Sequence, residues 1–334
     1  MTDRIAGRVA VTGGSGKLGR AVVAELLDHG YEVHVLDRVP PPVHPRAHAA
    51  FTRLELTDFG QVVEALTAID DRHHGLDAVV HLAAIPGPGV ATNAATFADN
   101  IRCSYNVFAG ARQAGIRNVV WASSETVLGL PFETPPPYIP VDEQYPARPE
   151  SSYSLAKHLD EQMAAQFARW DPQLKIIGLR FSNVMEPQDY AAFPAFDADP
   201  SLRKWNLWSY IDARDGAQAV RLALEYPNPG FEVFIIANAD TVMATRTSES
   251  LAADVYPGVP VLHELGEHET LLSIDKAGRL LGYRPRHSWR DEIEPDDGES
   301  ESSDPDSVAS DSARSGGARS NGTASTGAEP HTGE

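Results

Sequence analysis

The chain has 334 residues and a formal net charge of −19 at pH 7. This acidity excludes an ordinary nucleic-acid partner, because binding to phosphate backbones needs a basic surface. The single cysteine excludes an intramolecular disulfide and a cysteine-based zinc site, so we expect no metal and a reducing, cytoplasmic location. We also expect no signal peptide and no membrane span, since no apolar run approaches the roughly 20 residues that cross a bilayer.

The charge is spread unevenly along the chain. Residues 291–334 hold twelve acidic residues and two arginines, with almost no large apolar residue. We expect these residues to form a disordered acidic tail. The rest of the chain has only five lysines beside many arginines and acids. That composition is typical of a halophilic organism, and high-GC codon bias explains it equally well.

The first predicted element is a strand that runs into a glycine-rich turn and then into a helix. The strand is the apolar run at 8–11, and the helix over 17–27 places its apolar residues on one face. Gly13 permits a tight turn, Gly16 lets the backbone approach a pyrophosphate, and Gly19 allows the helix to pack closely on the strand. The amide groups at the start of the helix then face an anion.

A second strand, at residues 32–36, ends on Asp37 at roughly the ~20-residue distance typical of a ribose-binding acid. A carboxylate there accepts hydrogen bonds from the adenosine ribose and repels the extra phosphate of NADP. Asp37 therefore favours NAD, while the neighbouring Arg38 also permits NADP.

Strands and helices alternate along the rest of the chain. Further strands are predicted at 51–56, 78–82, 118–122 and 175–179, and further helices at about 58–69, 94–114, 151–169 and 215–225. This alternation predicts an α/β fold, a doubly wound parallel sheet of Rossmann type with helices on both faces.

We place the Rossmann core in residues 1–182 and a small C-terminal substrate-binding region in residues 183–290. This region is interleaved with the last Rossmann helix and strand at about 209–237, and the tail covers 291–334.

Ser124, Tyr153 and Lys157 form a second chemical motif. Tyr153 and Lys157 are four residues apart in SSYSLAK, on one face of the predicted helix. A tyrosine hydroxyl titrates near about 10, and a neighbouring ammonium group stabilises the phenolate so that the tyrosine can act as a base. Ser124, at the end of a strand, would hydrogen-bond the substrate oxygen. A pair of unrelated surface residues is the alternative explanation of the tyrosine–lysine spacing.

Motifs along the chain resemble those of the extended short-chain dehydrogenases/reductases, the NAD-dependent epimerase/dehydratase family. The resemblance covers about residues 7–285 and implies a Rossmann fold with NAD as cofactor. It rests on TGGSGKLG, Asp37, ELTD, HLAA, the asparagine of DNIRCSYNVF, SSETVLG, YSLAK, LRFSN and IDKAGRLLGYRP.

The resemblance also implies roles for individual residues. Tyr153 would be the general base, Lys157 would lower its pKa and bind the nicotinamide ribose, and Ser124, chosen over Ser123, would orient the substrate. Asn100 would position the lysine through its backbone or a water. The implied cofactor-binding residues are Gly13, Ser15, Gly16, Lys17, Leu18, Gly19, Asp37, Arg38, Glu55, Leu56, Leu82, Ala83, Ala84, Asn100, Tyr153, Lys157, Phe181 and Ser182. The implied substrate-binding residues are Ser124, Glu125, Tyr153, Asn183 and Arg203.

Two parts of the substrate-binding set have open interpretations. Glu125 can reach the substrate, although a carboxylate on such a loop is more often solvated. Arg203 and Lys204 can contact an anionic or phosphorylated sugar, or can simply flank a buried Trp205 and Trp208.

Three further polar residues are expected to be mainly structural. His81 leaves a buried strand, where a histidine is more often satisfied by the backbone than by a substrate. Arg180 lies at a strand end. Asp215 resembles a structural acid at the N-terminus of a helix.

The chain departs from the sugar-nucleotide enzymes after LRFSN. It continues with Val184-Met185-Glu186-Pro187, and only about 25 residues separate Asn183 from the next helical segment. A small pocket and a Glu-Pro pair resemble the uronate and aldose 1-dehydrogenases, which oxidise a free sugar at its anomeric carbon to a lactone. We expect this reaction on an aldose, uronate or sugar phosphate. The alternatives are a redox-neutral nucleotide-sugar epimerase or dehydratase and, less favoured, an inactive NAD-binding sensor.

The resemblance finally implies a homodimer through a four-helix interface. Each subunit would contribute the predicted helices at 94–114 and 151–169. Burial in the core of one subunit explains the apolar content of these helices equally well.

Overall fold

The structure is a computed structural model that describes residues 6–41, 50–68 and 73–292. Its main feature is a seven-stranded parallel sheet in the order β3-β2-β1-β4-β5-β6-β9. The strands are β1 (Arg8–Thr12), β2 (Glu32–Asp37), β3 (Ala50–Arg53), β4 (Ala78–His81), β5 (Asn118–Ser124), β6 (Lys175–Phe181) and β9 (Gly230–Ile236). The strand order reverses between β1 and β4, where sheets of this kind bind ligands. The predicted doubly wound α/β fold is confirmed.

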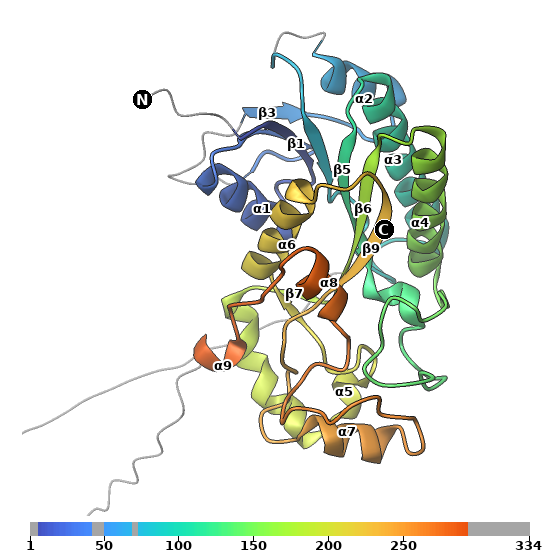
Figure 1. Ribbon diagram of the computed structural model, residues 1–334, viewed down its shortest axis with the longest axis vertical. Coiled ribbons are helices and arrows are strands. Elements are labelled where there is room, and N and C mark those ends of the chain that lie inside the picture. Colours follow the sequence, from blue (N-terminus) through green and yellow to red (C-terminus); the bar gives the residue numbers. More distant parts are fainter. Residues whose placement is uncertain (1–5, 42–49, 69–72, 293–334) are drawn as a thin grey trace, which may run out of the picture. The chain divides into compact units, whose positions relative to one another are not determined.

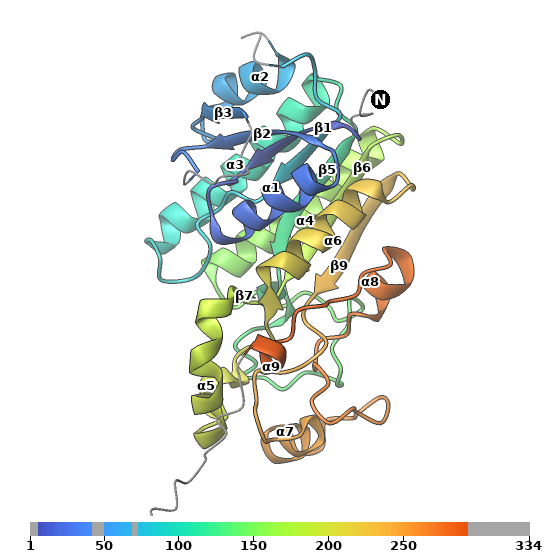
Figure 2. The same cartoon turned by 90° about the vertical axis from the view of Figure 1, so that its left-hand side faces the viewer.

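Helices cover both faces of this sheet (Figures 1 and 2). One face carries α1 (Lys17–Asp28) and α6 (Ala213–Glu225), which pack on each other; the other face carries α2 (Phe59–Thr67), α3 (Asn93–Gln113) and α4 (Ser152–Trp170). No helix within the described ranges is long and apolar enough to cross a membrane.

Strand β1 shows why the sheet needs helices on both faces. Val9 and Val11 point into the core under α1 and α6, and Ala10 points into the core under α2 and α3. All three side chains are buried, because successive residues of a strand face opposite sides. A run of apolar residues without alternation is therefore what a central parallel strand requires.

The observed elements differ from the predicted ranges mainly at their ends. β5 and β6 run two residues further than predicted, to Ser124 and Phe181, because the pairing between the two strands continues to that point. β3 is shorter than predicted and covers only Ala50–Arg53. Helix α6 begins at Ala213 instead of residue 215, because Asp212 caps it.

A second buried core lies at the C-terminal side of the sheet. The elements outside the main sheet and its covering helices are β7 (Val184–Met185) paired with β8 (Ile211–Asp212), the 3-10 helices η1 (Glu125–Leu128) and η2 (Pro187–Ala198), and the short helices α5 (Ser201–Lys204), α7 (Ser248–Val255), α8 (Asp275–Leu280) and α9 (Trp289–Glu292). Ile211 of β8 and Ala277 of α8 are buried in the core under α1 and α6, not in this second core. Its buried side chains include the aromatic residues Tyr190, Phe193, Trp208, Tyr210, Tyr256 and Trp289. The segment that follows β5 packs in the same core through Val127, Leu128, Leu130, Phe132, Ile139, Val141 and Tyr145. The boundaries at 182 and 290 stay a prediction.

The first two residues of the predicted tail lie in a short helix. Asp291 and Glu292 belong to α9, and Arg214 donates to Glu292 Oε1 at 2.7 Å. The indole of the preceding Trp289 is buried and donates from Nε1 to Thr241 O at 2.9 Å. Tertiary contacts of this kind are invisible in a local stretch of acidic sequence. The rest of the predicted tail, residues 293–334, lies outside the described residues.

Removal of residues 293–334 is expected to leave kcat/KM and the melting temperature unchanged, because this acidic segment has almost no large apolar residue to bury. Truncation before Trp289 should instead lower the melting temperature by several degrees, since it removes a buried aromatic side chain. Steady-state assays and thermal melts of both truncated proteins test this pair of outcomes. A large loss of activity in the shorter truncation, at residue 293, would contradict the first expectation.

Candidate active site

The glycine-rich turn between β1 and α1 is closely packed on both sides. Gly13 has φ of +72°, and a Cβ placed there would lie 2.6 Å from the backbone N of Ala83. A Cβ on Gly19 would lie 2.1 Å from the carbonyl oxygen of Gly13. Both positions therefore require glycine, because each lies where two backbone segments meet.

Gly16 differs from these two glycines. A Cβ at Gly16 would meet only Gly13 O, at 3.3 Å, and its backbone is extended with φ of −73° and ψ of 175°. A side chain at Gly16 would therefore need only a small shift of Gly13 O, much less than one at Gly13 or Gly19. The turn fits the pyrophosphate of a dinucleotide, which needs backbone N–H donors at close range.

Asp37 lies at the C-terminal end of β2 and reaches back to this turn. Its Oδ2 accepts from Ser15 N at 3.1 Å, and its Oδ1 accepts from Val39 N at 3.2 Å. Arg38, the residue that would permit NADP, is held by an ion pair with Glu55 at 3.0 Å. The carboxylate expected to bind ribose therefore adjoins the phosphate-binding turn, and the arginine is already paired.

Two ion pairs join the start of α1 to the segment after β6. Lys17 Nζ lies 2.5 Å from Asp189 Oδ2, and Arg20 lies 2.9 Å from Glu186 Oε1. Lys17, expected to contact the cofactor, is thus paired with an acid of η2. These contacts hold the Glu-Pro segment beside the phosphate-binding turn.

Tyr153 and Lys157 lie together in the first turns of α4. The helix begins at Ser152 because Ser151 and Ser154 form a capping box. Lys157 is 3% exposed, and its Nζ donates to Ala122 O at 2.7 Å and lies 5.9 Å from the centre of the Tyr153 ring. The ammonium group is therefore fixed between β5 and the tyrosine, where its charge can stabilise a phenolate.

The two serines at the end of β5 face different environments. Ser123 Oγ donates to Glu161 Oε1 at 2.6 Å, inside a buried ion pair in which Arg180 binds Glu161 through two hydrogen bonds. Ser124 Oγ accepts from the N–H and the hydroxyl of Thr126, at 3.2 and 3.0 Å. No acceptor for the Ser124 O–H is found among the described residues. Ser123 and Arg180 are thus structural, and Ser124 has a hydroxyl proton to offer.

Glu125 is not solvated, contrary to the sequence-based expectation. The residue is 2% exposed, and Asn206 Nδ2 donates to its Oε1 at 3.3 Å. Burial raises the pKa of Glu125 to about 7, although hydrogen bonds and the Arg203 charge act in the opposite direction. Glu125 begins η1, and its side chain lies among the polar groups of Ser182, Arg203 and Asn206 instead of in water.

Arg203 and Lys204 have different surroundings. Arg203 is 5% exposed, donates to Ser209 O at 2.7 Å and lies over the rings of Phe196 and Trp205 at 5.4 and 5.1 Å. Lys204 Nζ lies 5.8 Å from the centre of the Tyr256 ring. Trp205, expected to be buried, is only partly so. Arg203, buried close to Glu125, is therefore the basic residue that can act at this site.

His81 is satisfied by side chains and not by the backbone. Its Nδ1 lies 2.7 Å from Thr12 Oγ1, and its Nε2 lies 3.5 Å from Ser104 Oγ. Burial, with a smaller contribution from the Lys157 charge, lowers the pKa of His81 to about 3, so the ring is neutral. His81 is thus a neutral, buried residue near Lys157, held in place by Thr12 and Ser104.

Asn100 is bound to the loop that follows β4. Its side chain accepts from Ile85 N at 2.8 Å and donates to Ile85 O at 3.1 Å. The expected action on Lys157, through the backbone or a water, stays a prediction.

Asp215 does not cap α6. The N-cap is Asp212, which accepts from Arg214 N at 2.7 Å. Asp215 is fully buried; its Oδ2 accepts from the backbone N–H groups of Arg286 and His287 at 2.9 and 2.8 Å. It therefore fixes the C-terminal segment, a role that its own sequence neighbourhood did not indicate.

Two functional-site residues were missed from the sequence. Asn206 contacts Glu125, but nothing in WNLW marks it. Asp160 lies three residues after Lys157 on α4, is fully buried and accepts from Ser104 Oγ at 2.8 Å. Burial raises the pKa of Asp160 to about 7, against the nearby Lys157 charge. Its spacing from Lys157 was a signal that could have been used.

The remaining predicted residues also lie at the C-terminal ends of the strands, because parallel strands end at one edge of a sheet. Glu55 and Leu56 follow β3, Phe181 ends β6, and Leu82, Ala83, Ala84, Ser182 and Asn183 lie just beyond strands β4 and β6.

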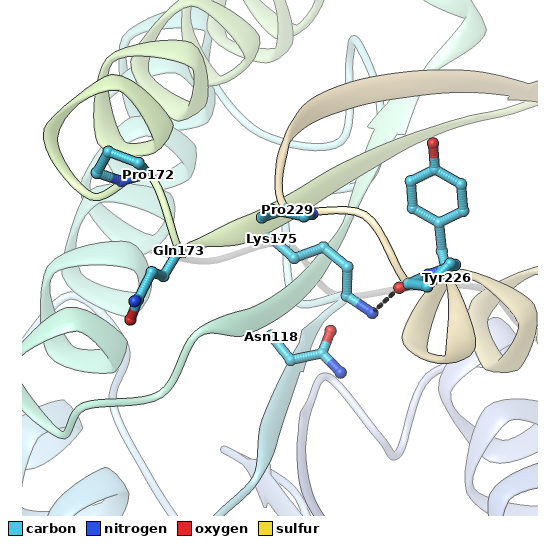
Figure 3. A pocket seen from close by; sticks show the side chains of 7 residues that line it. Asn118, Pro172, Gln173, Lys175, Tyr226 and Pro229 are labelled. Atoms are coloured by element: carbon cyan, nitrogen blue, oxygen red, sulfur yellow. Dashed lines mark hydrogen bonds between the residues drawn. The ribbon is translucent and has the colours of Figure 1, made fainter.

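A surface hollow lies at the opposite edge of the sheet. It encloses about 330 Å³ and is lined by Asn118, Pro172, Gln173, Lys175, Tyr226, Pro227 and Pro229 (Figure 3). Lys175 Nζ donates to Leu224 O at 2.6 Å and to Tyr226 O at 2.7 Å, which satisfies carbonyls at the end of α6. This hollow is separate from the candidate active site.

Within the described residues, no cluster of histidine, cysteine and acidic side chains could hold a metal ion.

The buried Glu125 gives a pH-dependent stability that can be measured. Its carboxyl titrates at about 7 when folded and at 4.5 as an unperturbed group, so the folded state binds more protons between these values. The free energy of unfolding contributed by this group therefore falls as pH rises through that window. Glu125→Gln removes the titration, so the stability of the variant relative to the wild type should rise by on the order of 2 kcal/mol from pH 5 to pH 8.

Urea unfolding at both pH values measures this difference. Glu64→Gln, an exposed site on α2, is the control and should show the same difference at both pH values. A pH-independent offset for Glu125→Gln would show that Glu125 is not buried as a charge-sensitive group.

The phosphate-binding turn, Asp37 and the tyrosine–lysine pair define a dinucleotide-binding enzyme of the extended short-chain dehydrogenase/reductase type. The chain belongs to the NAD dependent epimerase/dehydratase family, whose model matches residues 9–237. NAD is therefore its cofactor. The fold is similar to that of the solved structure of MoeE5 in complex with UDP-glucuronic acid and NAD (24% identity, TM-score 0.62, 85% of this chain and 95% of that chain).

Similar proteins of this family catalyse two kinds of reaction. The L-arabinose 1-dehydrogenase (NAD(P)(+)) of Haloferax volcanii is 26% identical over 296 residues, covering 86% of this chain and 99% of that protein. The UDP-glucose 4-epimerase of Corynebacterium glutamicum is 25% identical over 311 residues, covering 84% and 92%. A crystal structure of UDP-galactose 4-epimerase has a TM-score of 0.61 at 27% identity, covering 85% of this chain and 95% of that one.

Proposed function

We propose that this protein is an NAD-dependent oxidoreductase that oxidises a free sugar at its anomeric carbon to a lactone. The observation that carries the proposal is the buried arrangement of Ser124, Tyr153 and Lys157, in which the Ser124 hydroxyl keeps a proton to donate. The similarity to an L-arabinose 1-dehydrogenase along almost the whole length of that protein supports it.

Each residue of this group has one task in the proposed reaction. The Ser124 hydroxyl donates a hydrogen bond to the anomeric oxygen and holds it beside Tyr153. The Tyr153 phenolate, stabilised by the fixed Lys157 ammonium, removes the hydroxyl proton. The anomeric C–H bond then breaks as the C=O bond of the lactone forms. NAD, when bound, supplies the acceptor for the hydride, and the products are lactone, NADH and a proton.

The second candidate function is a redox-neutral epimerase or dehydratase of a nucleotide sugar. The same three residues would serve it, and the likeness to UDP-glucose and UDP-galactose 4-epimerases supports it. The short segment between Asn183 and β8 favours the smaller substrate, because it leaves little chain to bind a nucleotide. An inactive NAD-binding sensor is least favoured, since the catalytic tyrosine is present.

NADH formation with NAD and a panel of aldoses, uronates and sugar phosphates tests the proposal. We expect one class of free sugar to respond, and the assay repeated in molar salt tests the halophilic interpretation of the composition. No response with any sugar, together with NAD already bound to the purified protein, would favour the epimerase or dehydratase.

We also propose that two subunits associate through α3 and α4. Large apolar side chains are exposed on these two helices: Tyr105 is 50% exposed, Leu155 41%, Leu159 38% and Trp170 49%. Leu155 and Leu159 are four residues apart and share one face of α4. Replacing both leucines with glutamate is expected to convert a dimer to a monomer in light-scattering measurements. A wild-type protein that is monomeric at micromolar concentration would contradict this proposal.

A further inference from the structure

Three buried polar side chains lie near Ser124 with atoms that have no partner. Within the described residues, Glu125 Oε2, Arg203 Nε and Asn206 Oδ1 are buried and make no close hydrogen bond, and the Ser182 side chain and the Asn183 N–H face the Glu125 carboxyl from the segment after β6. Their residues are 2%, 5% and 0% exposed, respectively. Each unpaired group of this kind costs about 1–3 kcal/mol, so three in one place indicate a site where a bound molecule supplies the missing partners.

The three atoms do not have the same hydrogen-bonding character. Arg203 Nε is a donor and Asn206 Oδ1 is an acceptor, and Glu125 Oε2 can only accept once its carboxyl is ionised, above a pKa of about 7. A sugar hydroxyl can donate to either acceptor and accept from the arginine. A carboxylate or phosphate oxygen can only accept, so it would face two acceptors and one donor.

The charges in the site also favour a neutral sugar hydroxyl over a carboxylate or phosphate. The Arg203 guanidinium is fixed by its bond to Ser209 O and by its position over the rings of Phe196 and Trp205. Its positive charge interacts with the buried Glu125 carboxylate. An anionic substrate group brought to Arg203 would therefore lie beside a second negative charge in a poorly solvated place.

We infer that Glu125, Arg203 and Asn206 form a subsite for the hydroxyl groups of an uncharged sugar, and that Glu125 excludes uronates and sugar phosphates. The inference rests on the proposed function and narrows its substrate to a neutral aldose. Glu125 is adjacent in sequence to Ser124, so the subsite adjoins the serine that holds the anomeric oxygen. The negative charge of Glu125 would thus determine the preference for neutral aldoses over uronates and sugar phosphates.

The test compares neutral aldoses with the matching uronates and aldose phosphates at pH 8, where the Glu125 carboxyl is charged. We expect kcat/KM for the best neutral aldose to exceed that for its uronate by at least about 100-fold. Glu125→Gln replaces an acceptor and a charge by an amide that also donates. It should lower this ratio at least about tenfold, mainly by lowering KM for the uronate. Glu64→Gln is the matched control and should keep the wild-type ratio.

A direct binding measurement separates this inference from the proposed function. Calorimetric titration of the Tyr153→Phe protein, loaded with NADH, should show binding of the neutral aldose and no binding of the uronate. The Tyr153→Phe/Glu125→Gln double variant should bind the same aldose with lower affinity. Preference for a uronate or phosphate, or an unchanged ratio in Glu125→Gln, would overturn the inference while leaving a sugar dehydrogenase in place. No NADH from any sugar would overturn the proposed function, and failure of every free sugar to bind would overturn both.

Discussion

The Tyr153→Phe variant is expected to lose about 10²–10⁴-fold in kcat, because it lacks the hydroxyl that removes the substrate proton. NADH binding should persist, since the phenyl ring still packs beside Lys157 and the lysine stays bonded to Ala122 O. Steady-state rates and a fluorescence titration with NADH measure the two effects separately.

Tyr105→Phe provides a matched control for this variant. It makes the same chemical change on α3 at a side chain that is half exposed, so its kcat should equal that of the wild type. Turnover retained in Tyr153→Phe would contradict the assignment of Tyr153 as the base. A loss of NADH binding in that variant would show that the tyrosine has a structural role.

The second large effect is expected for Gly16→Ala. The new Cβ would lie 3.3 Å from Gly13 O, so the turn must shift by a few tenths of an ångström, and the melting temperature should fall far less than for Gly19→Ala, where the Cβ would lie 2.1 Å from the same oxygen. The same methyl group would occupy the space through which a pyrophosphate approaches the amides of α1. The Kd for NADH is therefore expected to rise by at least about 100-fold, equivalent to about 2.7 kcal/mol, in a calorimetric titration.

Gly87→Ala and Gly19→Ala are the two controls for the Gly16→Ala variant. A Cβ at Gly87 meets nothing within 4 Å, so this variant should bind NADH normally. A Cβ at Gly19 would collide with Gly13 O, so that variant should lose stability as well as cofactor binding. Normal NADH affinity in Gly16→Ala would mean that the dinucleotide does not lie over this turn.

The parts of the fold that local sequence determines were predicted from the sequence. The apolar run around Val9–Val11 has the composition of a strand buried on both faces, and it is one. Helix α4 was predicted to within one residue at each end, since Ser151 caps it and its apolar residues recur at helical spacing. The C-terminal edge of the sheet gathered the predicted cofactor and catalytic residues because consecutive parallel strands all end there.

The parts that depend on distant contacts were not predictable in this way. Glu125 is buried because Asn206, 81 residues further along the chain, packs against it and donates to its carboxylate. Asp215 is bonded to residues 71 and 72 positions away, and Asp291 is in a helix that Trp289 anchors to the second core. Local sequence predicts that a loop of serine, glutamate and threonine is exposed, because it does not show that the distant segment around Asn206 covers the loop.

The measurement that tests the central claim most directly uses a sugar labelled with deuterium at the anomeric carbon. With the best substrate of the NADH assay, the account predicts one deuterium in each NADH formed and an unlabelled lactone, with the label absent from the solvent. It also predicts a slower rate if breakage of the C–H bond limits turnover. Unlabelled NADH, with a sugar product that keeps its anomeric deuterium, would contradict this account, because the hydride would then come from another carbon of the sugar.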